Sequence, residues 1–120
     1  MKLRPQSAKA KGRNLQKLVR DAILSRYPEL EPDDVKSTSM GASGEDVQLS
    51  PAARKVLPVA IECKAIAKIA ACRFYDQAKQ HAEERPGTEP VVVMKENGSK
   101  PLVIVDLDYF LHLMRIRSHG

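Results

Sequence analysis

The sequence contains few aromatic residues and few cysteines, and it has no long apolar segment. Aromatic residues make up 4% of the 120 residues and tryptophan is absent, so the core must be aliphatic. The two cysteines, Cys63 and Cys72, are too few for a disulfide scaffold and are typical of a reducing compartment. No apolar run approaches the roughly 20 residues that cross a bilayer. A disulfide-rich secreted protein and a membrane-spanning protein are therefore disfavoured.

Acidic residues are absent from the first 20 positions, although the chain carries 15 of them. That segment holds seven lysine and arginine residues, whereas the remaining 100 residues hold 13 basic and 15 acidic ones. The net charge of +5 therefore comes from the N-terminal end. Basic arms commonly bind polyanions, because each neutralised phosphate releases condensed counterions. A solubilising tail that binds nothing is the alternative left open.

Hydrophobic periodicity and turn residues predict one α/β domain over residues 12–117, preceded by a flexible basic arm over residues 1–11. The predicted helices span residues 12–26, 68–84 and 108–117, and the predicted strands span residues 35–40, 46–49, 56–66, 90–95 and 102–105. Residues 50–55 are predicted to form a loop. Asn97-Gly98 predicts a hairpin between the last two strands. This order of elements predicts a mixed central sheet flanked by helices.

Phe110, Leu113 and Met114 are the residues of the last predicted helix that we expect to face the core.

The strand predicted at residues 56–66 contains two charged residues. Glu62 and Lys64 are two positions apart and so project from one face, while Ile61 and Cys63 project from the other. Charge in a buried strand is costly unless it is paired or binds a metal. An edge strand with a solvated ion pair is the alternative. Asp46 begins the preceding predicted strand, and hairpin pairing would bring it beside Glu62.

Two carboxylates and a lysine at one sheet edge suit phosphodiester hydrolysis. Carboxylate oxygens bind hard divalent cations such as Mg²⁺, with Mn²⁺ as an expected substitute. The metal withdraws charge from the phosphate and activates a water, while a nearby cation stabilises the developing charge. Glu45 is expected to point away from Asp46, because neighbouring residues alternate along a strand.

Zinc, cysteine and nucleotide chemistry have little support in the sequence. His81, His112 and His119 have no zinc-ligand spacing with the cysteines, so they are expected at the surface or at helix ends. The Cys63 side chain is expected on the apolar side of its strand, which disfavours a nucleophilic role. Neither GxxxxGK[ST] nor GxGxxG occurs.

Asp46 followed by Glu62-Cys63-Lys64 resembles the PD-(D/E)XK nuclease motif. Further matches occur in the expected order, and the set is similar to the archaeal-type Holliday junction resolvases and to small phage nucleases. These matches are Lys11-Gly12-Arg13-Asn14-Leu15-Gln16 at the head of the first helix, Ala42-Ser43-Gly44 before the Asp, Gln77 in the next long helix, and Lys95 ending the next strand. The resemblance covers about residues 11–113.

The resemblance implies a restriction-endonuclease-like domain with a magnesium-dependent active site. Asp46 and Glu62 would bind the metal with the backbone carbonyl of Cys63, and Lys64 would be catalytic. Ser43 would correspond to a loop residue near the scissile phosphate.

Two residues on the predicted helices complete the implied active site. Gln77 would support it from the helix that follows the motif. Gln16 stands where the resolvases usually have a glutamate, and its amide brings no negative charge. We therefore expect weaker metal affinity or the absence of a second metal.

The predicted function is metal-dependent hydrolysis of DNA phosphodiester bonds, selective for branched DNA such as Holliday junctions. A nicking or single-strand-processing nuclease is one alternative, and a catalytically weak DNA-binding module of the same fold is another. Two symmetric cuts imply a homodimer. The expected location is the cytoplasm of a bacterial, archaeal or phage-infected host cell. The residues expected to contact DNA are Lys11, Arg13, Lys17, Arg20, Arg54, Lys55 and Lys95.

Overall fold

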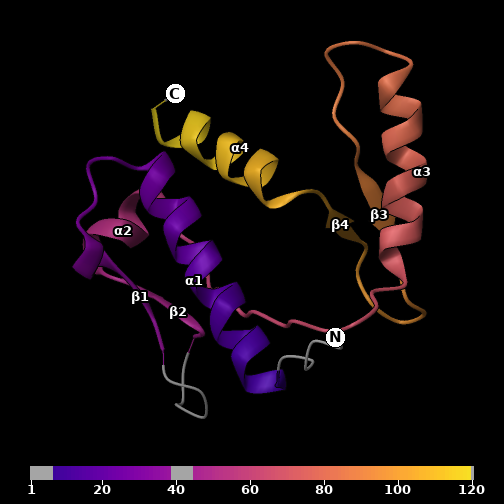
Figure 1. Cartoon of the computed structure of the whole chain (residues 1–120). Coiled ribbons are helices and arrows are strands. Elements are labelled where there is room, and N and C mark those ends of the chain that lie inside the picture. Colours follow the sequence, from indigo (N-terminus) through magenta and orange to yellow (C-terminus); the bar gives the residue numbers. More distant parts are fainter. Residues whose placement is uncertain (1–6, 39–44, 120) are drawn as a thin grey trace, which may run out of the picture. The chain divides into compact units, whose positions relative to one another are not determined.

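The computed structural model describes residues 7–38 and 45–119, and it has a mixed α/β structure (Figure 1). Four α-helices, one short 3-10 helix and four strands lie within these residues. The chain divides into two compact units. Unit 1 comprises Met1–Ile66 with Leu111–Gly120, and unit 2 comprises Ala67–Phe110. None of the helices in the described residues combines the length and the apolar character needed to cross a membrane.

Helix α1 (Ala8–Arg26) is the longest element of unit 1 and packs on its two strands. It begins four residues before the predicted start, because the Ser7 hydroxyl accepts a hydrogen bond from the Ala10 N–H at 3.1 Å. The helix ends just before Pro28, which cannot continue it. Residues 1–6 of the predicted flexible arm lie outside the described residues, whereas residues 8–11 are helical.

The strands β1 (Val35–Ser37) and β2 (Val47–Leu49) form an antiparallel pair beside α1. Val35, Val47 and Leu49 are buried, while the alternate positions Lys36 and Gln48 are exposed. This alternation is expected of a sheet with one covered face. The core of unit 1 is aliphatic apart from one tyrosine and one glutamine, as the composition predicts. Its buried residues are Gln16, Val19, Ile23, Tyr27, Leu30, Val35, Val47, Leu49, Ala53, Leu57 and Leu111.

The loop predicted at residues 50–55 is wrong, because a short helix, α2 (Pro51–Val56), lies there. The Ser50 hydroxyl caps it by accepting from the Ala53 N–H at 3.1 Å. The proline that follows Ser50 suits the first helical position, where no N–H is needed. Ser50 also donates to the Asp34 carboxylate at 2.7 Å, next to the 3-10 helix η1 (Pro32–Asp34), and this hydrogen bond lowers the pKa of Asp34.

The strand predicted at residues 56–66 is also wrong as an element, although the structure describes all of these residues. Residues 57–66 form a single bridge, between Ile61 and Val47, and are otherwise irregular. Val56 belongs to α2, and the Leu57 N–H closes that helix by donating to the Ala53 carbonyl. Pro58 has no N–H to donate to a ladder. Apolar content alone therefore does not make this segment a strand.

Unit 2 consists of helix α3 (Ala71–Glu83) and the antiparallel strands β3 (Val92–Met94) and β4 (Leu102–Ile104). The predicted helix and hairpin are confirmed, with shorter bounds. Gly98 has a φ of +80°, which glycine adopts without strain, and the Ser99 N–H donates to the Glu96 carbonyl. No residue of unit 2 is buried, and all of its residues are described.

The described strands form two separate antiparallel pairs and not one mixed sheet. β1 pairs with β2, and β3 pairs with β4. Val93 and Val103 lie directly opposite each other in the second pair and are 64% and 62% exposed. The mixed α/β composition is therefore as predicted, whereas the single central sheet is not present among the described strands.

Helix α4 (Leu107–His119) closes unit 1 with its C-terminal part. Its buried residue is Leu111, whereas Leu113, which was predicted to face the core, is 44% exposed. Phe110 and Met114 are half-buried. The helix begins one residue earlier than predicted, and the Asp106 carboxylate accepts from the Tyr109 N–H at its start.

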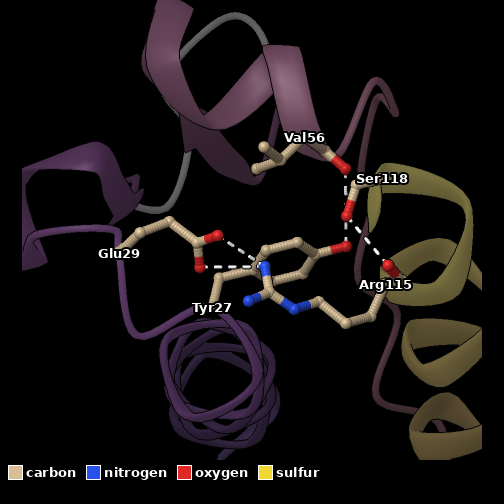
Figure 2. Close-up of polar contacts among 5 residues, drawn as sticks. All are labelled: Tyr27, Glu29, Val56, Arg115 and Ser118. Carbon is tan, nitrogen blue, oxygen red and sulfur yellow. Dashed lines mark hydrogen bonds and ion pairs between the residues drawn. The ribbon is translucent and has the colours of Figure 1, made fainter. Parts of the chain in front are cut away.

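Tyr27 joins α4 to the end of α1 (Figure 2). Its side chain is fully buried, and its hydroxyl donates to the Val56 carbonyl at 3.4 Å and is hydrogen-bonded to Ser118. The Arg115 guanidinium lies 4.8 Å from the ring centroid and donates to both oxygens of Glu29, at 2.9 and 2.6 Å. Burial raises the pKa of Tyr27, so the hydroxyl stays protonated at neutral pH.

Replacing Arg115 with methionine keeps most of the side-chain volume but removes the cation–π contact and the ion pair. We expect the free energy of unfolding to fall by about 1–2 kcal/mol in urea denaturation. Arg117→Met, in the exposed part of the same helix, is the matched control and should change the stability by less than about 0.5 kcal/mol. Equal losses in the two variants would contradict a stabilising role for the Arg115 contacts.

Candidate metal centre

Asp46 is held by hydrogen bonds on three sides. Its N–H donates to the Ile61 carbonyl at 3.0 Å, and its own carbonyl accepts from the Thr38 N–H at 3.0 Å. The Thr38 hydroxyl also donates to this carbonyl at 3.1 Å. The carboxylate oxygen Oδ2 accepts from the Cys63 N–H at 2.6 Å. Backbone and side chain of Asp46 are therefore both fixed against the segment that carries Glu62.

Asp46 and Glu62 line one hollow of about 410 Å³, which we call the Asp46 hollow. Its described lining residues are Glu45, Asp46, Ala60, Ile61 and Glu62. The antiparallel bridge between Val47 and Ile61 explains why both acids line this hollow. Asp46 is the neighbour of Val47 in the chain, and Glu62 is the neighbour of Ile61. The expected approach of Asp46 to Glu62 is thus present, although it comes from one bridge and not from a continuous strand.

Glu45 also lines the Asp46 hollow, contrary to the expectation that it points away. Strand alternation does not apply to it, because β2 begins only at Val47. Its carboxylate oxygen Oε2 lies 2.6 Å from Nη2 of Arg54. The hollow therefore has three acidic residues along its wall, one of which is neutralised by an arginine.

Sequence reasoning missed both Glu45 as a lining residue and its ion pair with Arg54. The signal for the first was its position next to Asp46 and ahead of the strand. The ion pair had no signal, because no helix or strand period relates two residues nine positions apart.

Lys64 lies beside Glu62, although the strand from which their shared face was predicted is not present there. The Lys64 Nζ is 3.7 Å from Oε1 of Glu62, and both side chains are 76% exposed. An ion pair this exposed contributes about 0–1 kcal/mol, so neither side chain is held in place by it. This geometry matches the solvated pair that the sequence left as an alternative, and it also leaves the ammonium able to turn toward a bound anion.

Cys63 is half-buried next to Asp46. Burial, with a further contribution from the Asp46 charge, raises the pKa of its thiol. The thiol is therefore neutral at pH 7, which agrees with the expectation that Cys63 is not a nucleophile. Its N–H is engaged by Asp46, while metal binding by its carbonyl stays a prediction.

The three remaining predicted catalytic residues lie elsewhere or outside the described residues. Gln16 is 3% exposed on the core side of α1 and is not among the described residues that line the Asp46 hollow. Ser43 lies outside the described residues. Gln77 is exposed on α3, in unit 2. The catalytic roles of these residues stay predictions.

The basic residues of α1 fall into two groups. Lys11, Arg13 and Lys17 are exposed, as a DNA-contacting surface requires. Arg20 is half-buried, and its Nε donates to the Val35 carbonyl at 3.0 Å. Arg20 is therefore engaged in joining α1 to β1 and is less available for DNA.

The basic residues beyond α1 differ in the same way. Arg54 is engaged, because its Nε donates to the Leu49 carbonyl at 3.2 Å and its Nη2 pairs with Glu45. Lys55, on α2, is exposed. Lys95 is exposed just after β3.

Comparison of the chain with family models, curated proteins and solved structures found no match. Among residues 7–38 and 45–119, no group of three or more histidine, cysteine, aspartate or glutamate side chains is arranged to hold a metal ion. Mg²⁺ nevertheless is often held in proteins by one or two carboxylates, with water and substrate phosphates completing its shell. Asp46 and Glu62 in one open hollow fit that mode of binding.

Calorimetric titration tests this fit directly. We expect the protein to bind Mn²⁺, and Asp46→Asn or Glu62→Gln to weaken binding at least about 10-fold, because each removes one of two anionic ligands. Glu96→Gln, in the exposed turn of the hairpin, removes an equal charge and should leave the affinity unchanged. Unchanged Mn²⁺ binding in both site variants would exclude the Asp46 hollow as a metal site.

Proposed function

We propose that the protein is a metal-dependent endonuclease that hydrolyses DNA phosphodiester bonds, with selectivity for branched DNA such as Holliday junctions. The observation that carries the proposal is the meeting of Asp46 and Glu62 at one hollow with Lys64 beside Glu62. The order of these residues along the chain resembles the PD-(D/E)XK motif. Two carboxylates and a cation at one open surface suit a phosphodiester, which is anionic and must be reached from solvent.

Asp46 and Glu62 would hold Mg²⁺, which withdraws charge from a phosphate and lowers the pKa of a bound water. Asp46 is oriented for this by the Cys63 N–H, which engages Oδ2 and leaves Oδ1 available. Lys64 would place its ammonium against the charge that develops on the phosphate oxygens. Its exposure permits that movement, because only one weak ion pair must be given up.

A restriction-endonuclease-like domain over residues 12–117 is part of the proposal. The described elements support it by their order, in which a helix, a strand pair and the short helix α2 precede Glu62 and Lys64, and a helix, a hairpin and a last helix follow. We also propose a homodimer, because a two-fold junction needs two symmetric cuts. The proposed setting is the cytoplasm, where both cysteines stay reduced.

A DNA-binding module without catalysis is the second candidate. Gln16 favours it, because a buried neutral amide stands at the position where the resemblance leads us to expect an acid. Metal binding separates the two candidates, since only the nuclease depends on a cation at Asp46 and Glu62.

Cleavage of a four-way junction, a duplex and a single strand in the presence of Mg²⁺ tests the proposal. We expect the junction to be cut fastest, and Glu62→Ala or Lys64→Ala to lower the rate at least about 100-fold. Both side chains are exposed, so their loss should not change the melting temperature. Full activity in Glu62→Ala would contradict the assignment, and preference for the single strand would select the nicking or single-strand-processing alternative.

The salt dependence of DNA binding tests the basic surface of α1. Replacing Lys11, Arg13 and Lys17 with glutamine should lower the slope of log K against log salt by about 2 to 3 if each contacts one phosphate of a duplex. Replacing Lys68, Lys79 and Arg85 of unit 2 removes the same charge and should change the slope less. An unchanged slope in the first variant would mean that α1 does not contact phosphate.

A further inference from the structure

We propose that Arg54 is a positioning residue for the Asp46 hollow, and that it acts by fixing the segment that carries Asp46. This inference rests on the proposed function, because it assigns Arg54 to the metal site and not to the DNA backbone. The sequence had placed Arg54 among the residues that contact phosphate.

The Arg54 guanidinium engages both ends of one short segment. Its Nε–H donates to the Leu49 carbonyl at 3.2 Å, and its Nη2 donates to Glu45 Oε2 at 2.6 Å. Glu45 directly precedes Asp46, and Leu49 is the last residue of β2. A planar guanidinium presents its donors at fixed spacing, so binding at two points ties the Glu45 carboxylate to the Leu49 carbonyl. A lysine has no such fixed pair of donors.

The backbone of Arg54 is itself held in place by helix α2. Arg54 lies on α2, whose first turn is capped by Ser50 and whose Ala53 is fully buried. The Arg54 N–H donates to the Ser50 carbonyl at 2.9 Å, in the first turn of the helix. The backbone of Arg54 is therefore fixed by α2, and its guanidinium contacts Glu45 and Leu49, which lie on either side of Asp46 in the chain.

The two ion pairs at the Asp46 hollow differ in what they can hold. Glu62 and Lys64 are both 76% exposed and 3.7 Å apart, whereas Arg54 and Glu45 are 47% and 27% exposed and 2.6 Å apart. A shorter and less solvated pair is stronger and more directional. Of the two cations paired with acids of the Asp46 hollow, Arg54 has the contacts suited to fixing a residue, and Lys64 has those suited to moving.

Removal of Arg54 would have two effects of opposite sign on cation binding. It would release the negative charge of Glu45 and remove a positive charge, and electrostatics alone would then strengthen cation binding. It would also loosen the Asp46 segment, which would weaken cation binding. The direction of the change in affinity therefore distinguishes a positioning role from a purely electrostatic one.

The test is calorimetric titration of the full chain with Mn²⁺ in Arg54→Met and Arg54→Lys. We expect Arg54→Met to weaken Mn²⁺ binding about 10-fold, the lower end of the range for residues that orient metal ligands. Arg54→Lys keeps the charge but loses the two-point contact, so it should restore the affinity only in part. Lys36→Met, on the exposed side of β1, removes an equal charge from unit 1 and should leave Mn²⁺ affinity unchanged.

Steady-state cleavage gives a second readout. A positioning role predicts a lower kcat in both Arg54 variants with little change in the KM for DNA, whereas a phosphate contact predicts a higher KM with kcat retained. If Arg54→Met melts early, the comparison uses Arg54→Lys.

Two outcomes overturn the inference and are distinguishable. Unchanged or tighter Mn²⁺ binding in Arg54→Met, with Asp46-dependent binding in the wild type, overturns the positioning role alone. Absence of Asp46-dependent Mn²⁺ binding in the wild type overturns the proposed function, and the inference with it.

Discussion

The hydrogen bonds between Asp46 and residues 61–63 are the contacts on which the candidate site depends. The Asp46 N–H reaches the Ile61 carbonyl, and the Cys63 N–H reaches the Asp46 carboxylate. They bring an acid that directly precedes β2 to an acid from an irregular segment 16 positions away in the chain. Together with the bridge between Val47 and Ile61, they hold Asp46 and Glu62 at the same hollow.

The strand pair next to Asp46 packs in the core of unit 1. α1 covers the β1–β2 pair, α2 buries Ala53, and α4 is joined to the end of α1 through Tyr27 and Arg115. Burial is concentrated in this unit, because none of the residues of unit 2, all of them described, is buried. The side chains at the Asp46 hollow thus belong to the well-packed unit. Asp46 is held by its own hydrogen bonds, and the strand that follows it is held by that packing.

Local patterns predicted the three longer helices and the hairpin well, whereas they missed the short helix α2 and predicted the long-range contacts poorly. The periodicity of α1 and the Asn97-Gly98 turn depend on residues close in sequence, so they can be recognised without knowing the fold. The segment 56–66 looked like a strand because it is rich in apolar residues. A strand also needs a partner along its length, and here the partner is limited to one bridge at Val47.

The sequence by itself determined that α1 presents exposed basic residues and that the core is aliphatic. Each follows from spacing or composition, which need no distant contact. The tertiary structure alone decided that Glu45 faces the same hollow as Asp46, that Arg54 holds Glu45, and that Arg20 joins α1 to β1. These outcomes depend on which distant segments come together in the folded chain. The charge of a side chain does not by itself specify the group it pairs with.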